Sequence, residues 1–193
     1  NSHECSVNLA QDPDEYVRGS VAESPRTPAA VLAALAEDSS EWVQRSVAGN
    51  PSAPVDALLA LATSDQASIL ASVGSNPTTP PDILARLAVT ATQGGGSTYD
   101  RERIQWGLAF NPSTPGEALR LVATAGADIR AQVARHPSAP VDLLATLSKD
   151  KAKTVREAVA TNPNAPEDVK DVALALTASA RAKRPTVAER AEL

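Results

Sequence analysis

Residues 43–62 read Val-Gln-Arg-Ser-Val-Ala-Gly-Asn-Pro-Ser-Ala-Pro-Val-Asp-Ala-Leu-Leu-Ala-Leu-Ala. Close copies of this phrase return about every 26 residues along the chain. Each copy carries two prolines three residues apart, namely Pro25/Pro28, Pro51/Pro54, Pro77/Pro80, Pro112/Pro115, Pro137/Pro140 and Pro163/Pro166. A period of this length indicates a stack of similar supersecondary units and not a single folded globule.

The segment before the first proline of each copy predicts a short helix. Apolar residues recur there at i, i+4 and i+5, which places them on one stripe of a helix. Two of these columns hold Val17, Val43, Ile69, Ile104, Ile129 and Val155, then Val21, Val47, Val73, Leu108, Val133 and Val159. The helix should end at the residue before the proline, because proline drives its predecessor out of the α region. That residue is usually asparagine, whose side chain can bond to the backbone of a turn.

The segment after the first proline predicts a second short helix. The second proline suits the first helical position, where its missing N–H costs nothing. An acidic residue often follows two positions later and favours the positive end of the helix dipole. Neither helix can bury its apolar face alone, so we expect stability to come from stacking neighbouring repeats.

Composition limits the range of possible functions. The chain has 193 residues, a net charge of -5 and only 3% aromatic residues, so its core must be built from Ala, Val and Leu. The charge is uneven: residues 1–100 hold four Lys/Arg against twelve Asp/Glu, and residues 101–193 hold fourteen against eleven. The negative total disfavours a general nucleic-acid binder. The asymmetry leaves open nucleic-acid binding through the basic C-terminal half, or head-to-tail self-association.

Catalytic and metal-binding patterns are not evident in the sequence. Cys5 is the single cysteine, and its grouping with His3 and Glu4 at the chain end is a weak sign of a metal site. His136 takes the asparagine position before Pro137, so we expect it to act in the turn. No run is long and apolar enough for a membrane span, and a cytoplasmic location is the default expectation. We therefore expect no enzyme activity and no cofactor or metal.

The recurring Val-Ala-x-Asn-Pro-x-x-Pro and Leu-x-x-Leu-Ala segments resemble the leucine-rich repeat variant (LRV) family over roughly residues 9–176. The resemblance implies an all-α fold, a right-handed α-solenoid of about six to seven two-helix repeats similar to HEAT and armadillo proteins. It implies no defined activity. One relative of this type holds an iron–sulfur centre on a cysteine cluster, which Cys5 alone does not provide.

We expect a repeat domain over residues 1–176 and a C-terminal capping or tail segment over 177–193. The tail contains a capping-box sequence after Pro185 and is expected to pack on the repeats or on another copy. The domain contains an insertion at 90–103, because Pro77 and Pro112 are 35 residues apart. Its glycines lack the Lys-Ser/Thr of a phosphate loop, so a flexible loop is the simpler interpretation.

Aromatic residues gather next to the insertion. Trp106 and Phe110 are four residues apart on a predicted helix, in columns that are variable and often polar in other repeats. Such columns should face away from the core, which makes the pair a candidate partner-binding site. The alternative is that the insertion covers it. The full candidate set is Tyr99, Arg101, Arg103, Trp106, Phe110 and Arg135, which Arg45 could extend.

A polar column follows the first apolar column, with Arg18, Gln44, Gln105, Arg130 and Arg156. It could form a ladder along one face, although solvated side chains that cover neighbouring helices are the simpler interpretation. Taken together, the sequence predicts a non-catalytic scaffold that binds a protein or peptide. Nucleic-acid binding and structural self-assembly remain the alternatives.

Overall fold

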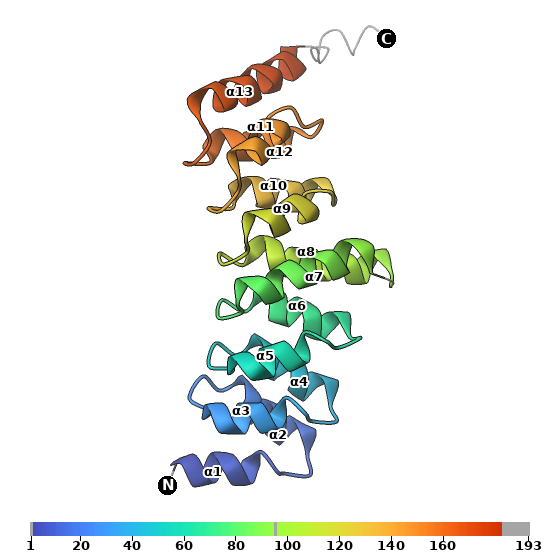
Figure 1. Cartoon of the computed structure of the whole chain (residues 1–193), viewed down its shortest axis with the longest axis vertical. Coiled ribbons are helices and arrows are strands. Elements are labelled where there is room, and N and C mark those ends of the chain that lie inside the picture. Colours follow the sequence, from blue (N-terminus) through green and yellow to red (C-terminus); the bar gives the residue numbers. More distant parts are fainter. Residues whose placement is uncertain (1, 95, 183–193) are drawn as a thin grey trace, which may run out of the picture. The chain divides into compact units, whose positions relative to one another are not determined.

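The computed structural model describes residues 2–94 and 96–182 and divides the chain into two compact units, Asn1–Val122 and Ala123–Leu193. The described residues form thirteen helices and no strand (Figure 1). The first unit contains α1 (Ser2–Leu9), α2 (Glu15–Glu23), α3 (Ala29–Leu35), α4 (Glu41–Gly49), α5 (Val55–Leu61), α6 (Ala67–Ser75), α7 (Pro81–Gln93), α8 (Thr98–Phe110) and α9 (Gly116–Val122). The second contains α10 (Ala127–Arg135), α11 (Val141–Leu147), α12 (Lys153–Thr161) and α13 (Glu167–Ala182).

Helices of successive repeats stack within each unit, as the sequence predicts. In the first unit α2, α4, α6 and α8 contact one another in that order. In the second unit α10, α12 and α13 do the same, and α11 contacts both α10 and α12. The predicted apolar columns are buried: Val43, Val47, Ile69 and Val73 have no exposed side-chain surface. The prediction of an all-helical repeat fold is confirmed.

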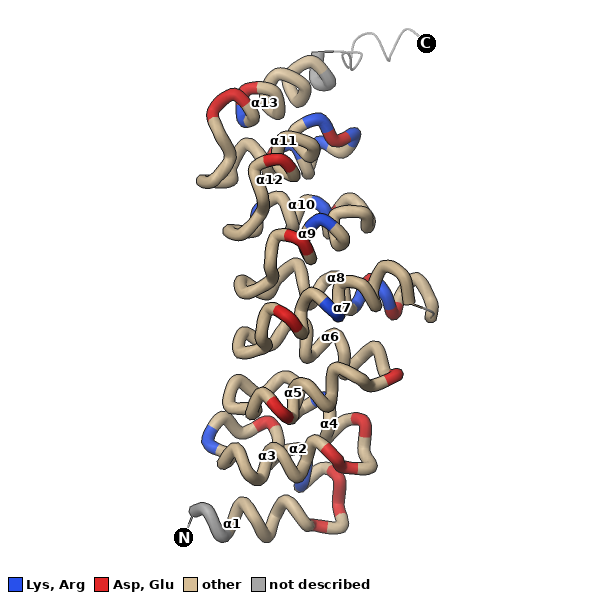
Figure 2. Tube along the Cα trace, in the orientation of Figure 1, with Lys and Arg blue, Asp and Glu red and all other residues tan. Residues whose placement is uncertain are grey.

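The prolines set where the second helices begin. Pro28, Pro54, Pro80 and Pro140 are the N-cap residues of α3, α5, α7 and α11, with extended ψ angles. The prediction that they occupy the first helical position is wrong by one residue, because each proline carbonyl already accepts the first helical hydrogen bond. The acidic first turns are confirmed, and Figure 2 shows them in red at the starts of α5, α7, α9 and α11.

Each turn asparagine bonds to two successive repeats. The Oδ1 of Asn76 accepts from the backbone N–H of Thr78 at 3.0 Å, which confirms its predicted role in the turn. Its Nδ2 also reaches back to the previous repeat and donates to the carbonyls of Ala48 and Asn50 at 2.7 and 2.9 Å. The other turn asparagines also donate two hydrogen bonds to carbonyls of the previous repeat. They are Asn50 to Ala22 and Ser24, Asn111 to Gly74 and Asn76, and Asn162 to Ala134 and His136. We call this series the asparagine ladder.

The polar column makes specific links, so the interpretation of solvated side chains is wrong. Arg18 donates two hydrogen bonds to the carboxylate of Asp38, at 2.6 and 2.9 Å, and also bonds to the Asp12 carbonyl. Arg130 pairs with Asp150 in the same way. Gln44, Gln105 and Arg156 each donate to a turn or helix-end carbonyl. The column therefore ties the first helix of a repeat to the turns on either side of it.

The insertion at 90–103 mainly lengthens two helices. The helices α7 and α8 have 13 residues each, whereas α5 has 7 and α6 has 9. The loop between them is confined to 94–97, where Gly96 has a positive φ of 111° and the Ser97 hydroxyl caps α8 by accepting from the Asp100 N–H. A flexible loop over the whole insertion is therefore not what the structure shows.

At the C-terminal end, α13 runs through residue 177, where we expected a tail to begin. The predicted capping box after Pro185 lies outside the described residues.

Candidate partner-binding surface

Four of the predicted site residues form one stripe on α8. Tyr99, Arg103, Trp106 and Phe110 follow the spacing i, i+4, i+7 and i+11, which keeps them on a single helical face. The guanidinium of Arg103 lies 5.8 Å from the ring centroid of Tyr99, within the range of a cation–π contact. The rings of Trp106 and Phe110 stack with centroids 5.5 Å apart and planes inclined by 21°. We call these four residues the α8 stripe.

The α8 stripe is open to solvent. Phe110 is 60% exposed and Tyr99 is 68% exposed, while Trp106 is partly exposed. The alternative in which the insertion covers the aromatic pair is therefore not seen. The lengthened helices α7 and α8 pack on each other and leave the stripe uncovered.

An open hollow of about 360 Å³ lies beside the stripe, between α6 and α8. The α8 side is lined by Arg103, Trp106, Gly107 and Phe110, and the α6 side is lined only by the small residues Ser68, Ala71, Ser72 and Ser75. Gly107 permits the close approach of the two helices, because a Cβ there would lie 2.6 Å from the Ala71 carbonyl oxygen. One wall of the hollow is thus large and aromatic, and the other is flat.

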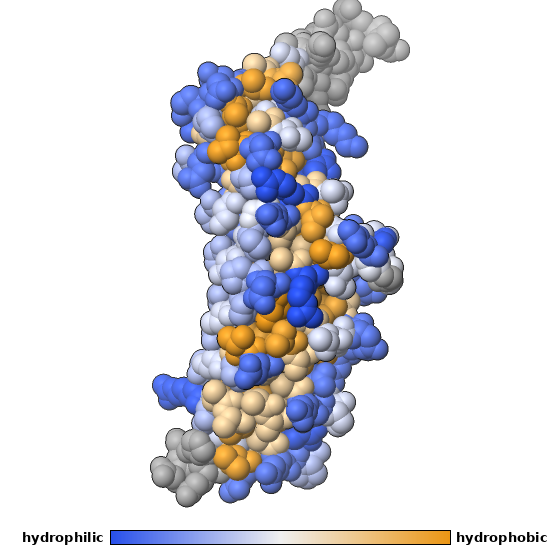
Figure 3. All heavy atoms as spheres, in the orientation of Figure 1, coloured by the Kyte–Doolittle hydropathy of each residue, from blue (hydrophilic) through white to orange (hydrophobic). Residues whose placement is uncertain are grey.

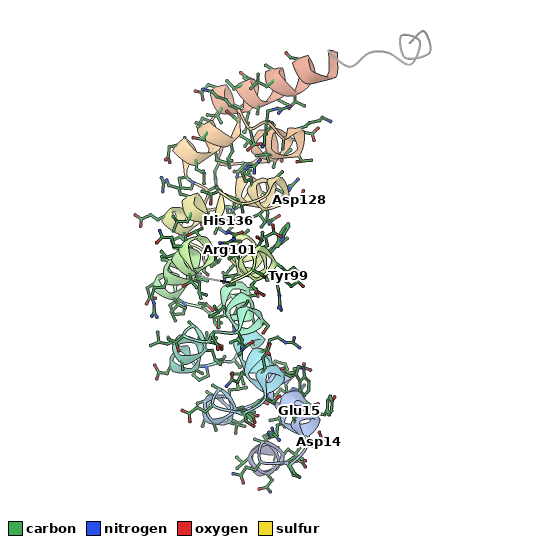
Figure 4. The ribbon with its side chains drawn as sticks, turned by 90° about the vertical axis from the view of Figure 1, so that its right-hand side faces the viewer. Asp14, Glu15, Tyr99, Arg101, Asp128 and His136 are labelled. Atoms are coloured by element: carbon green, nitrogen blue, oxygen red, sulfur yellow. The ribbon has the colours of Figure 1, made fainter. Side chains whose placement is uncertain are left out.

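Two predicted site residues lie elsewhere. Arg101 is two residues before Arg103, which turns it about 200° around the helix. Figure 4 accordingly shows Tyr99 and Arg101 on opposite sides of α8. Arg135 is the last residue of α10, in the second unit. The structure therefore groups Tyr99, Arg103, Trp106 and Phe110, and does not bring Arg101 to their face.

The sequence reasoning missed a second aromatic pair, Tyr16 on α2 and Trp42 on α4. Their ring centroids are 5.6 Å apart with planes inclined by 48°, and Tyr16 is 69% exposed. The indole lies directly on the backbone of Gly19, since a Cβ at that glycine would fall 1.9 Å from the Trp42 ring. A signal was available: both aromatics stand nine residues before the first proline of their repeats, as Arg103 does.

Two further observations bear on chemistry. Among the described residues no group of three His, Cys, Asp or Glu side chains could hold a metal ion, and Cys5 is an exposed free thiol. In the same part of the chain, no helix is long and apolar enough to cross a membrane.

A comparison with known families supports the repeat interpretation. Residues 104–163 match the model of the Leucine Rich Repeat Variant domain. The resemblance drawn from the sequence is confirmed over this segment. The Leucine Rich Repeat Variant match begins in α8 and includes Trp106 and Phe110, whereas Tyr99, Arg103 and the Tyr16–Trp42 pair precede it. Searches of curated proteins and of solved structures return no match.

Proposed function

We propose that this chain is a non-catalytic repeat scaffold that binds a protein or peptide partner at the α8 stripe. The observation that carries the proposal is the exposed stack of Trp106 and Phe110 beside the hollow over α6. Large aromatic side chains next to a hollow are typical anchors of binding interfaces, since they bury much surface at little cost in conformational entropy. As part of this proposal, the two-helix repeats, about six to seven in number, wind into a right-handed solenoid, as the family resemblance implies.

Other exposed apolar residues provide a contrast. Val55 and Leu59 on α5 are 50% and 41% exposed, and Figure 3 shows apolar side chains gathered over that helix. They are aliphatic and do not line the hollow between α6 and α8. Exposed aliphatic residues are common on protein surfaces, more than half of whose area is apolar. They therefore serve as a matched control.

The test is affinity capture from a nuclease-treated lysate of the cells that make the protein. The baits are wild type, Trp106→Ala/Phe110→Ala and the control Val55→Ala/Leu59→Ala, each first shown to be folded by circular dichroism and thermal melting. We expect wild type and the control to retain a protein that the aromatic double variant loses. Equal retention by all three baits, or retention by none, would refute the proposed site.

A further inference from the structure

One junction of the repeats carries a side chain that can gain a proton near neutral pH. Histidine is the residue type whose charge ordinarily changes between pH 5 and 8. His136 follows α10 as its C-cap residue and is only 2% exposed, so a titratable group lies buried in the second unit. The position that it occupies, directly before the first proline of each copy, holds Ser24, Asn50, Asn76, Asn111, His136 and Asn162.

The imidazole of His136 takes the place of an asparagine amide in the turn between α10 and α11. Its Nδ1 accepts from the backbone N–H of Ser138 at 3.0 Å, as the Oδ1 of Asn162 accepts from the N–H of Asn164 at 2.8 Å. The expected role of His136 in the turn is therefore confirmed. A backbone N–H can only donate, so Nδ1 must offer its lone pair, and the ring is neutral with its proton on Nε2.

Protonation of the ring conflicts with this geometry. A second proton on Nδ1 would point at the Ser138 N–H, so a contact between two donors would replace the hydrogen bond. The imidazolium would also place a charge on a side chain that has almost no contact with water, and burial disfavours the charged form. His136 therefore takes up a proton readily only when the turn opens. An asparagine amide at the same position does not titrate in this pH range.

Opening of this turn affects the next repeat of the same unit. The backbone carbonyl of His136 accepts from the Ala139 N–H at 3.1 Å and from the Nδ2 of Asn162 at 3.3 Å. The bond from Asn162 is the weakest of the asparagine ladder, whose other bonds measure 2.6–2.9 Å. A turn that opens at His136 moves this carbonyl and leaves Asn162 with its bond to Ala134. The junction between the stacked helices α10 and α12 is then weaker.

The charged side chains near the turn do not decide the direction of the effect. Within the second unit α10 packs against α11 and α12. Arg135 precedes His136 at the end of α10 and disfavours a second positive charge, whereas Asp142 in the first turn of α11 favours one. Both are exposed, so water and salt screen their effect. On α12, Glu157 is paired with Lys153 at 3.0 Å. The donor at Nδ1 and the burial of the ring therefore set the sign.

We propose that His136 is an acid-sensitive switch in the second unit: its protonation opens the turn between α10 and α11 and loosens the junction with α12, whereas the turns that carry asparagine stay closed. The switch is independent of the α8 stripe and of the function proposed for it. In the unfolded chain the histidine pKa is about 6.5. Below that pH the unfolded state binds more protons than the folded one, so stability falls as the pH decreases. If the folded state excluded the proton completely, its folding constant would fall about 30-fold between pH 7.5 and 5, which is the upper limit.

The test compares the full wild-type chain with His136→Asn, which introduces the residue of the neighbouring turns, and with the control His3→Gln, which changes the other histidine. Each is unfolded in urea at pH 7.5 and at pH 5, followed by circular dichroism. The ratio of the unfolding constants of wild type and His136→Asn at one pH cancels the titration of the carboxylates that both share. We expect this ratio to rise about five- to thirtyfold from pH 7.5 to pH 5. His3→Gln should behave as wild type does.

Nuclear magnetic resonance of the ¹⁵N-labelled chain separates an open turn from a general loss of stability. At pH 7.5 the His136 ring of wild type should carry its proton on Nε2. At pH 5 the Ser138 amide should exchange with solvent at least about fivefold faster in wild type than in His136→Asn, because only the histidine turn opens. A proton on Nδ1 at pH 7.5, or equal exchange of Ser138 in the two proteins at pH 5, overturns the switch. So does an unfolding ratio that is independent of pH, or a pH effect that His3→Gln removes.

Discussion

Replacing Asn76 by alanine tests whether the asparagine ladder holds the repeats together. The side chain is 1% exposed and makes four hydrogen bonds. Two of them connect to Thr78, which is exposed and can turn to water. The other two connect to the carbonyls of Ala48 and Asn50 in the previous repeat, and the Ala48 carbonyl belongs to the last turn of α4, where no helical partner remains.

The expected magnitude follows from these contacts. A lost hydrogen bond costs about 1 kcal/mol, and a buried acceptor left without a donor costs about 1–3 kcal/mol. The Asn50 carbonyl still accepts from the Ala53 N–H, and water replaces the two bonds to Thr78, so Asn76→Ala should lower the free energy of unfolding by about 2–4 kcal/mol. The matched control Thr78→Ala removes only one bond to the same amide and should cost less than about 1 kcal/mol.

Equilibrium urea unfolding supplies the measurement, followed by far-ultraviolet circular dichroism and by tryptophan fluorescence. The fluorescence probes report from both sides of the change, since Trp42 lies on α4 and Trp106 lies on α8. Equal destabilisation by Asn76→Ala and Thr78→Ala would show that the bonds from Asn76 to the previous repeat do not hold the repeats together.

An isosteric variant sharpens the experiment. Asn76→Asp keeps the acceptor oxygen but directs a carboxylate at two carbonyls, which raises the pKa of the new group above its unfolded value. The deficit relative to wild type should therefore grow as the pH rises from 3 to 7, because folding then requires burial of the charged form. A deficit that is the same at both pH values would argue against this geometry.

Three further predictions concern other links. The Arg18 guanidinium donates hydrogen bonds that hold the pKa of Asp38 below its ordinary value, so the pair stabilises the fold above the unfolded pKa of about 4 and loses this effect as the pH falls through the folded pKa. Asp38→Asn should therefore lower Tm at pH 7 and have a shrinking effect toward pH 2, and a Tm difference that is independent of pH would contradict the pairing. Gly107→Ala should destabilise by about 1–3 kcal/mol in urea unfolding, since its Cβ meets the Ala71 carbonyl; a neutral result would show that α6 and α8 are not so closely packed. Gly49→Ala, where a Cβ meets nothing within 4 Å, should instead stabilise by about 0.5–1 kcal/mol, and a loss of stability would refute the open space there.

The sequence was sufficient for the helices and the core, because helix positions depend on local signals that recur in every copy. The asparagine at the end of α4 and the proline pair after it are such signals. The sequence did not predict that each asparagine also donates to the previous repeat. The carbonyls that accept from Asn76 lie 26 and 28 residues away and carry no side-chain signature. The extent of the loop at 94–97 was missed for a related reason: the glycines indicate where a helix stops, but not how far the flanking helices extend.

The candidate site was predicted in part. Spacing along one helix placed Trp106 and Phe110 on a shared exposed face, which the structure shows. The Tyr16–Trp42 pair depends on contact between α2 and α4 and on the missing side chain at Gly19, so comparing residues within one repeat could not find it. Comparing the same position across repeats would have found it.

The asparagine ladder has a consequence for changes in chain length. At the four junctions that carry an asparagine, the donor is a side chain, but the acceptors are backbone carbonyls, which every residue type supplies. A repeat that gains a new neighbour therefore needs no compensating side-chain change in that neighbour to keep these bonds. A chain joined in this way can be lengthened or shortened by whole repeats of about 26 residues and still connect at the new junction.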